Sequence, residues 1–98
     1  MRKDDWILKA LERIKEVLSQ RKVKGVVYLF GSSVRDDYRR TSDIDLAIDS
    51  PDRGVVTILR SDFEELDIPY KVDLVDLSEV GESLREEILK SGVIIWKN

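Results

Sequence analysis

The sequence contains no cysteine and no histidine among its 98 residues. Without them the chain cannot form disulfides, zinc sites of the Cys/His type, Ser-His-Asp triads or thiol nucleophiles. It also lacks any apolar run near the roughly 20 residues that a membrane-spanning helix needs. We therefore expect no membrane partner, and any chemistry must depend on carboxylates, hydroxyls, lysine, arginine and backbone amides.

The composition is that of a highly charged globular protein. Hydrophobic residues make up 42% of the chain and charged residues 38%, with a formal net charge of −3. This balance allows a buried core, and the acidic charge argues against broad, nonspecific nucleic-acid binding. The first five residues carry no apolar signal core. We expect one domain over residues 1–98, located in the cytoplasm and without a direct nucleic-acid partner.

Hydrophobic periodicity predicts alternating helices and strands. Residues 5–20 have helical spacing, as do the segments that begin at Ser50 and Ser78, where we expect each serine to cap its helix. Residues 32–41 are expected to form a helical turn and a loop. Four short apolar runs are typical of strands: residues 26–30, 43–48, 71–77 and 93–96. The order helix, strand, short helix, strand, helix, strand, helix, strand predicts an α/β (α+β) fold, with a mixed four-stranded sheet and helices mainly on one face.

A glycine-serine pair ends the first predicted strand. Gly31 would let a phosphate approach the backbone, and Ser32 would open a turn whose free amides and hydroxyl can bind an anion. Gly-Ser after a strand is more often a plain turn, so this motif gains meaning from its neighbours.

Acidic residues lie on the next two predicted strands. Asp43 and Asp45 are two residues apart, so on a strand they share one face, where they repel each other and are costly to desolvate. A divalent cation would relieve both problems, and oxygen ligands without His or Cys favour Mg²⁺ or Mn²⁺ over zinc. Asp73, within the third apolar run, also needs a partner. The competing third carboxylate is Asp76, which lies nearer the strand end and can begin the next turn.

A phosphate turn and three carboxylates match the parts of a two-metal nucleotidyl transfer. In this interpretation Asp43 and Asp45 hold the metal pair, and Asp73 binds the catalytic metal and accepts the proton of an attacking hydroxyl. The triphosphate would lie on the turn at Ser32, and pyrophosphate would leave.

In order and spacing, these motifs resemble the DNA polymerase beta-type nucleotidyltransferase superfamily. The matching segments are G-S-S-V-R from residue 31, T-S-D-I-D-L-A-I-D from residue 41 and V-D-L-V-D-L from residue 72. Among its members, the chain is similar to the smallest, the minimal nucleotidyltransferase (MNT) domains encoded beside HEPN-domain proteins. The similarity extends over nearly the whole chain.

The resemblance implies roles for individual residues. Gly31 and Ser32 would contact the triphosphate of ATP. The metal-binding catalytic carboxylates, holding two Mg²⁺ ions, would be Asp43, Asp45 and Asp73.

The loop after the glycine-serine pair both matches and departs from the family. Arg35 matches an arginine that members often carry there, and it would contact phosphate or the partner. An ion pair of Arg35 with Asp36 or Asp37 is the equal alternative. Relatives usually have glycine where this chain has Asp36, and an acid beside the phosphates would weaken nucleotide binding.

The resemblance also implies a partner. Larger relatives add a helical domain that holds the acceptor, and this sequence shows none, so we expect the acceptor on another protein. The HEPN partner would be a helical ribonuclease toxin. In some members the MNT antitoxin transfers AMP from ATP to a tyrosine of that toxin, and this is the leading hypothesis.

Two other hypotheses stay open. The first is a catalytically idle module that neutralises its partner by steric occlusion, and the second is an α/β domain whose acids are surface charge. A homo-oligomer is also possible, because the predicted edge strand 93–96 and Trp6 are apolar features that fit an interface. Core burial explains both features equally well.

Overall fold

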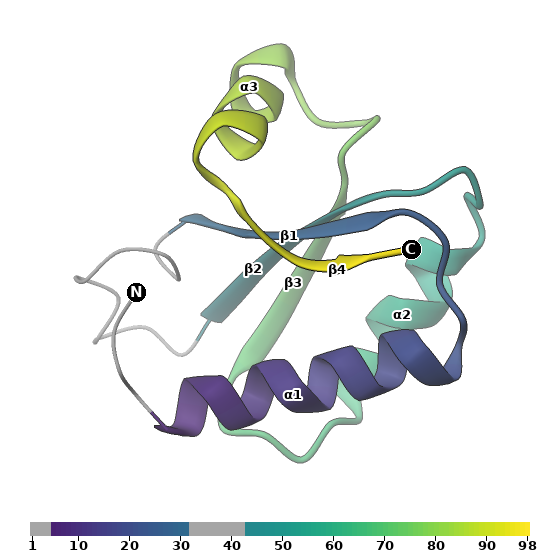
Figure 1. Ribbon diagram of the computed structural model, residues 1–98, viewed down its shortest axis with the longest axis vertical. Coiled ribbons are helices and arrows are strands. Elements are labelled where there is room, and N and C mark those ends of the chain that lie inside the picture. The colour runs from purple at the N-terminus through teal and green to yellow at the C-terminus, as the bar shows by residue number, and fades with distance from the viewer. Residues whose placement is uncertain (1–4, 32–42) are drawn as a thin grey trace.

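The computed structural model describes residues 5–31 and 43–98, except for the side chains of residues 5 and 6. Its elements in chain order are α1 (Asp5–Gln20), β1 (Val26–Phe30), β2 (Asp43–Asp49), α2 (Val55–Glu64), β3 (Lys71–Asp76), α3 (Glu82–Ser91) and β4 (Val93–Lys97). The strands form one sheet in the order β3-β2-β1-β4 (Figure 1). Strands β2 and β3 run parallel, and β1 is antiparallel to both β2 and β4. The predicted mixed four-stranded sheet is confirmed, whereas the short helix predicted at 32–41 lies outside the described residues.

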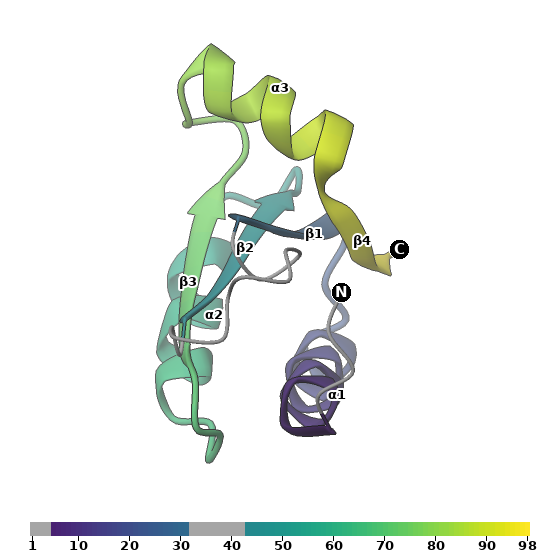
Figure 2. The ribbon, with the colours of Figure 1, turned by 90° about the vertical axis from the view of Figure 1, so that its left-hand side faces the viewer.

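Helices α1 and α2 cover one face of the sheet, and α3 lies on the other (Figure 2). The larger core fills the space under α1 and α2, where Ile14 of α1 and Leu59 of α2 are fully buried against the strands. Arg21, just after α1, donates two hydrogen bonds to the carboxylate of Asp62 in α2, at 2.8 and 2.9 Å. A smaller cluster on the opposite face holds α3. The expectation of helices mainly on one face is therefore confirmed.

Strand β2 lies in both cores because its side chains alternate between the two faces of the sheet. Its fully buried aliphatic residues at every second position belong to the core under α1 and α2: Ile44, Leu46 and Ile48. Ala47 belongs to the cluster under α3. Asp43 and Asp45 have the same parity as Ala47, so both acids lie on the face that carries α3.

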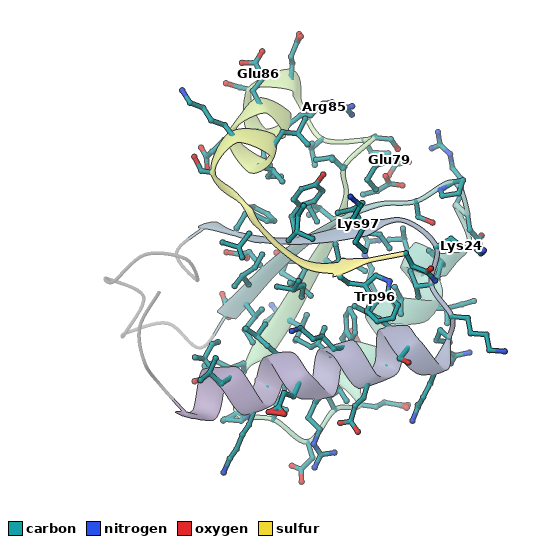
Figure 3. The ribbon with its side chains drawn as sticks, in the orientation of Figure 1. Lys24, Glu79, Arg85, Glu86, Trp96 and Lys97 are labelled. Atoms are coloured by element: carbon teal, nitrogen blue, oxygen red, sulfur yellow. The ribbon has the colours of Figure 1, made fainter. Side chains whose placement is uncertain are left out.

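Strand β4 forms one edge of the sheet. A register shift in its pairing with β1 is typical of a β-bulge, and both Ile95 and Trp96 pack against the core under α1 and α2. Trp96 lies between β4 and α1 (Figure 3), and its indole nitrogen donates a hydrogen bond to the carbonyl oxygen of Val23 at 3.1 Å. Val93 and Ile94 are 45% and 52% exposed. The strand is thus at an edge as expected, while self-association remains a prediction.

The predicted start of the second helix at Ser50 is wrong. Helix α2 begins at Val55, with Gly54 at its N-cap. The hydroxyl of Ser50 instead accepts a hydrogen bond from the backbone amide of Asp52 at 3.1 Å, and the carboxylate of Asp52 accepts one from the amide of Gly54 at 3.0 Å. Short polar side chains that bond to amides two residues ahead make turns in place of a helix.

The predicted cap at Ser78 is wrong for a related reason. Helix α3 begins at Glu82, with Gly81 at its N-cap. The hydroxyl and the amide of Ser78 both donate to Oδ1 of Asp76, at 2.7 and 2.9 Å. These two hydrogen bonds lower the pKa of Asp76. Asp76 therefore organises the turn that leaves β3.

None of the helices in the described ranges is long and apolar enough to cross a bilayer.

Replacing Leu46 with alanine should destabilise the fold by about 2–5 kcal/mol, because its fully buried side chain fills the core between β2 and the two covering helices. Chemical denaturation followed by circular dichroism measures the loss. Leu89→Ala is the matched control: Leu89 is 48% exposed, so its loss should stay within about 0.5 kcal/mol. Equal losses at the two positions would contradict this packing.

Candidate active site

The parallel pairing of β2 and β3 brings the predicted acids to one place. Asp45 pairs in register with Asp73, and Asp43 pairs with Lys71. Residues in register point to the same face of a sheet, as do residues two apart on one strand. Asp43, Asp45 and Asp73 therefore lie side by side on the face opposite α1 and α2.

Gly31 borders these acids on the β1 side. Phe30 pairs with Asp45, and Gly31 follows it with a φ of 72°. A Cβ on Gly31 would lie 2.6 Å from Oδ2 of Asp45, a distance that real Cβ atoms essentially never show. The left-handed backbone favours glycine, and a Cβ would also make the Asp45 carboxylate move. The backbone of this turn consequently lies directly against the acidic site.

The three acids repel one another. Burial raises the pKa of Asp45 above its usual range, and the charges of Asp73 and Asp43 raise it further. Added positive charge beside these acids would therefore favour the ionised form of Asp45. A bound cation would supply such a charge.

The donor set suits a hard divalent cation. Carboxylate oxygens without nitrogen or sulfur donors are the ligands that Mg²⁺ takes in proteins. Within residues 5–31 and 43–98, no three metal-ligating side chains are already drawn together around one point. The fit of Mg²⁺ thus rests on the donor chemistry, on the shared face and on the mutual repulsion of the acids.

The structure separates Asp76 from the other acids. Asp76 pairs with Ile48, at the far end of the β2–β3 ladder from Asp43. Its parity on β3 is opposite to that of Asp73, and its carboxylate accepts two hydrogen bonds from Ser78. The register therefore favours Asp73 over Asp76 as the third carboxylate of the site.

Three predicted residues of this region cannot be placed beside the acids. Ser32, Arg35 and Asp36 lie outside the described residues. Their expected contacts with phosphate, and the effect of an acid in the loop, stay predictions.

Sequence reasoning overlooked Lys71. The register places it opposite Asp43 and on the face of the three acids, and its side chain is exposed. It is the one basic residue in β1, β2 and β3. Its spacing of two from Asp73 predicts a shared face, but its position opposite Asp43 follows only from the register of β3 on β2.

Comparison with known proteins identifies the family. Residues 12–98 match the family model described as Polymerase beta, Nucleotidyltransferase. The chain belongs to this nucleotidyltransferase family. The family resemblance of its motifs is thereby confirmed, and so is the prediction that it is a nucleotidyltransferase.

The chain is also similar to an adenylyltransferase and to solved toxin-antitoxin structures. It is 38% identical over 85 residues to the probable protein adenylyltransferase MntA of Haemophilus influenzae, with 84% of this chain and 75% of that protein covered. A crystal structure of a toxin-antitoxin with AMP-PNP gives a TM-score of 0.68 at 29% identity, over 90% of this chain and 73% of that one. A structure of a tri-AMPylated Shewanella oneidensis HEPN toxin in complex with MNT antitoxin gives a TM-score of 0.64 at 27% identity, over 93% of this chain and 72% of that one.

Gly31→Ala should destabilise the fold by about 1–3 kcal/mol, because a residue with a Cβ is strained at positive φ and the new atom meets Asp45. Gly81→Ala is the matched control, because a Cβ there meets nothing within 4 Å. Its effect should stay below about 1 kcal/mol, the usual cost of placing alanine at an N-cap. Chemical denaturation distinguishes the two variants, and a neutral Gly31→Ala would contradict a strained backbone at this position.

Asp45→Asn should stabilise the metal-free protein at neutral pH, because it removes a partly buried charge that Asp73 and Asp43 repel. A carboxyl whose pKa is raised on folding contributes stability below its unfolded pKa and loses it as pH rises through its folded pKa. The advantage of the variant should therefore shrink as pH falls through the pKa of Asp45.

Thermal unfolding in a chelator at a series of pH values measures this advantage. Asp67→Asn, an exposed acid between α2 and β3, is the control and should follow the wild type at each pH. A wild type that is more stable than Asp45→Asn at neutral pH would contradict the repulsion among the acids.

Proposed function

We propose that the protein is an antitoxin that transfers AMP from ATP to a tyrosine hydroxyl of a partner HEPN-type toxin. The observation that carries the proposal is the register of β2 and β3, which aligns Asp45 with Asp73 beside Asp43 and opposite Gly31. Three carboxylates next to an open backbone turn are the parts that nucleotidyl transfer needs.

Each acid has a part in the transfer. Asp43 and Asp45 hold Mg²⁺, and Asp73 shares the metal and accepts the proton of the attacking hydroxyl. The acceptor oxygen forms a bond to the α-phosphorus of ATP, the bond from that phosphorus to the bridging oxygen of the β-phosphate breaks, and pyrophosphate leaves. Asp43, Asp45 and Asp73 would hold two Mg²⁺ ions, whose charge would offset that of the phosphate oxygens.

The triphosphate lies at the turn that follows β1. Gly31 supports this placement, because its φ of 72° and its close approach to Asp45 put the backbone of the turn directly beside the acids. Ser32 adds a hydroxyl donor and Arg35 a positive charge, and the resemblance to the family implies both roles. The nucleotide is thus held at the β1 side of the three acids.

The acceptor belongs to a second protein. One relative is described as a probable protein adenylyltransferase, and a similar structure is described as a tri-AMPylated HEPN toxin in complex with MNT antitoxin. These descriptions support a HEPN-domain protein as the partner of this chain. We place the activity in the cytoplasm and in a single minimal domain over residues 1–98.

The test is incubation with radiolabelled ATP, Mg²⁺ and the protein encoded beside this one. Wild type should label the partner on tyrosine, as mass spectrometry would show. Asp73→Asn should lower the transfer rate by about 10²–10⁴-fold, the usual contribution of a general base. Asp43→Asn and Asp45→Asn should each abolish the transfer, and added Mg²⁺ should not restore it.

Asp76→Asn is the matched control, since it removes an acid from the same strand that bonds to Ser78. It should transfer AMP at close to the wild-type rate. No label on the partner with wild-type protein would contradict the proposal. Neutralisation of the toxin that survives Asp43→Asn and Asp45→Asn would instead support steric occlusion.

A further inference from the structure

The sheet order gives the site two different sides. Strand β2 carries Asp43 and Asp45 in the middle, Gly31 follows β1 on one side, and Asp73 lies on β3 on the other. In nucleotidyl transfer the attacking and leaving oxygens lie roughly in line on opposite sides of the phosphorus. A triphosphate held at Gly31 thus directs pyrophosphate toward β1. The attacking oxygen must then approach from the β3 side.

Lys71 lies on the side from which that oxygen approaches. It occupies the β3 position opposite Asp43, two residues before Asp73, and points to the same face as both. No other residue of β1, β2 or β3 is basic, and Lys71 is exposed to an incoming molecule. A lysine ammonium here can meet a group that becomes negative during the reaction.

The edge of β3 also offers space for an acceptor. An open pocket of about 330 Å³ lies along this strand and the end of α2. Its lining is mixed, with apolar Phe63, Leu66 and Ile68 beside charged Arg60, Glu64, Lys71 and Asp73. Its volume is at the low end of the roughly 300–1,000 Å³ typical of ligand pockets. This lining offers both apolar and charged contacts to a peptide segment that approaches over the edge of β3. Strand β3 is an edge strand, so a segment can reach the pocket without displacing another strand.

We propose that the acceptor tyrosine enters over the edge of β3, where Lys71 contacts its phenolic oxygen. The segment that carries the tyrosine occupies the pocket beside β3. As the tyrosine proton passes to Asp73 and the oxygen bonds to the α-phosphorus, the ammonium of Lys71 stabilises the negative charge that develops on that oxygen. Lys71 is thus a catalytic residue of the acceptor side and takes no part in binding ATP. This inference rests on the proposed function and adds the direction from which the acceptor enters.

The experiment compares Lys71→Ala and Lys71→Arg in the AMP-transfer assay with the partner protein. Lys71→Ala should lower kcat/KM for the partner by about 10²–10³-fold, the usual loss for one donor to a developing oxyanion. Its KM for ATP should not change, nor should its Kd for Mg²⁺–ATP, measured by calorimetry without the partner. Lys71→Arg keeps the charge and should recover a large part of the rate.

Lys90→Ala is the matched control, because it removes an equal charge from an exposed position on α3. It should transfer AMP like the wild type. Thermal unfolding of each variant establishes that the fold is kept, and Lys71→Gln serves as a second neutral variant if Lys71→Ala unfolds early.

The outcomes separate this inference from the function on which it rests. A weaker Kd for Mg²⁺–ATP in Lys71→Ala would assign Lys71 to the nucleotide or to the acids, and would overturn the inference. Unchanged transfer by an active Lys71→Ala would overturn it too, while leaving the proposed function intact. A wild type that transfers no AMP would overturn the proposed function, and the inference with it.

Discussion

The parallel pairing of β2 with β3 positions every acid of the site. Parallel neighbours need a crossover, and here α2 supplies it by packing Leu59 and Phe63 onto the sheet. The register is held because Leu46 and Leu74 must both point into the core under α1 and α2, where each is buried. A slip by one residue would move Asp73 into that core and Leu74 onto the open face. The packing of one face thus determines the chemistry of the other.

The register places the like charges of Asp43, Asp45 and Asp73 side by side, which is unfavourable for folding. The raised pKa of Asp45 has two causes, its partial burial and the charges of its neighbours, and both follow from the same register. The hydrophobic core on the opposite face offsets this unfavourable term, because apolar burial there does not depend on the charge of the acids. Carboxylates that repel one another gain more free energy from binding a cation than carboxylates that lie apart, because the cation also removes their repulsion. In the proposed nucleotidyl transfer, this repulsion among the acids would favour the binding of a cation.

The sequence predicted the strands well, but it did not predict the turns before the helices or the contacts that depend on strand pairing. The strand boundaries and the shared face of Asp43 and Asp45 follow from apolar runs and alternation. The caps at Ser50 and Ser78 were wrong because each hydroxyl bonds within a turn instead: that of Ser50 accepts from the amide of Asp52, and that of Ser78 donates to the carboxylate of Asp76. Lys71 was overlooked because its position opposite Asp43 exists only once β3 pairs with β2. Its relation to the site is a property of register, which no local pattern contains.

The two free edges of the sheet can serve different contacts. Strands β3 and β4 lie at opposite ends of the order β3-β2-β1-β4 (Figure 2), and the acids lie near β3. The exposed Val93 and Ile94 belong to β4. Helix α3 packs near Ala47, on the face of the sheet that carries the acids. An interface formed at β4, with a second copy or with a partner, would therefore leave the edge of β3 accessible. Under the proposed function, one surface of the fold would hold the partner while another receives its tyrosine, which a module acting through a single contact would not need.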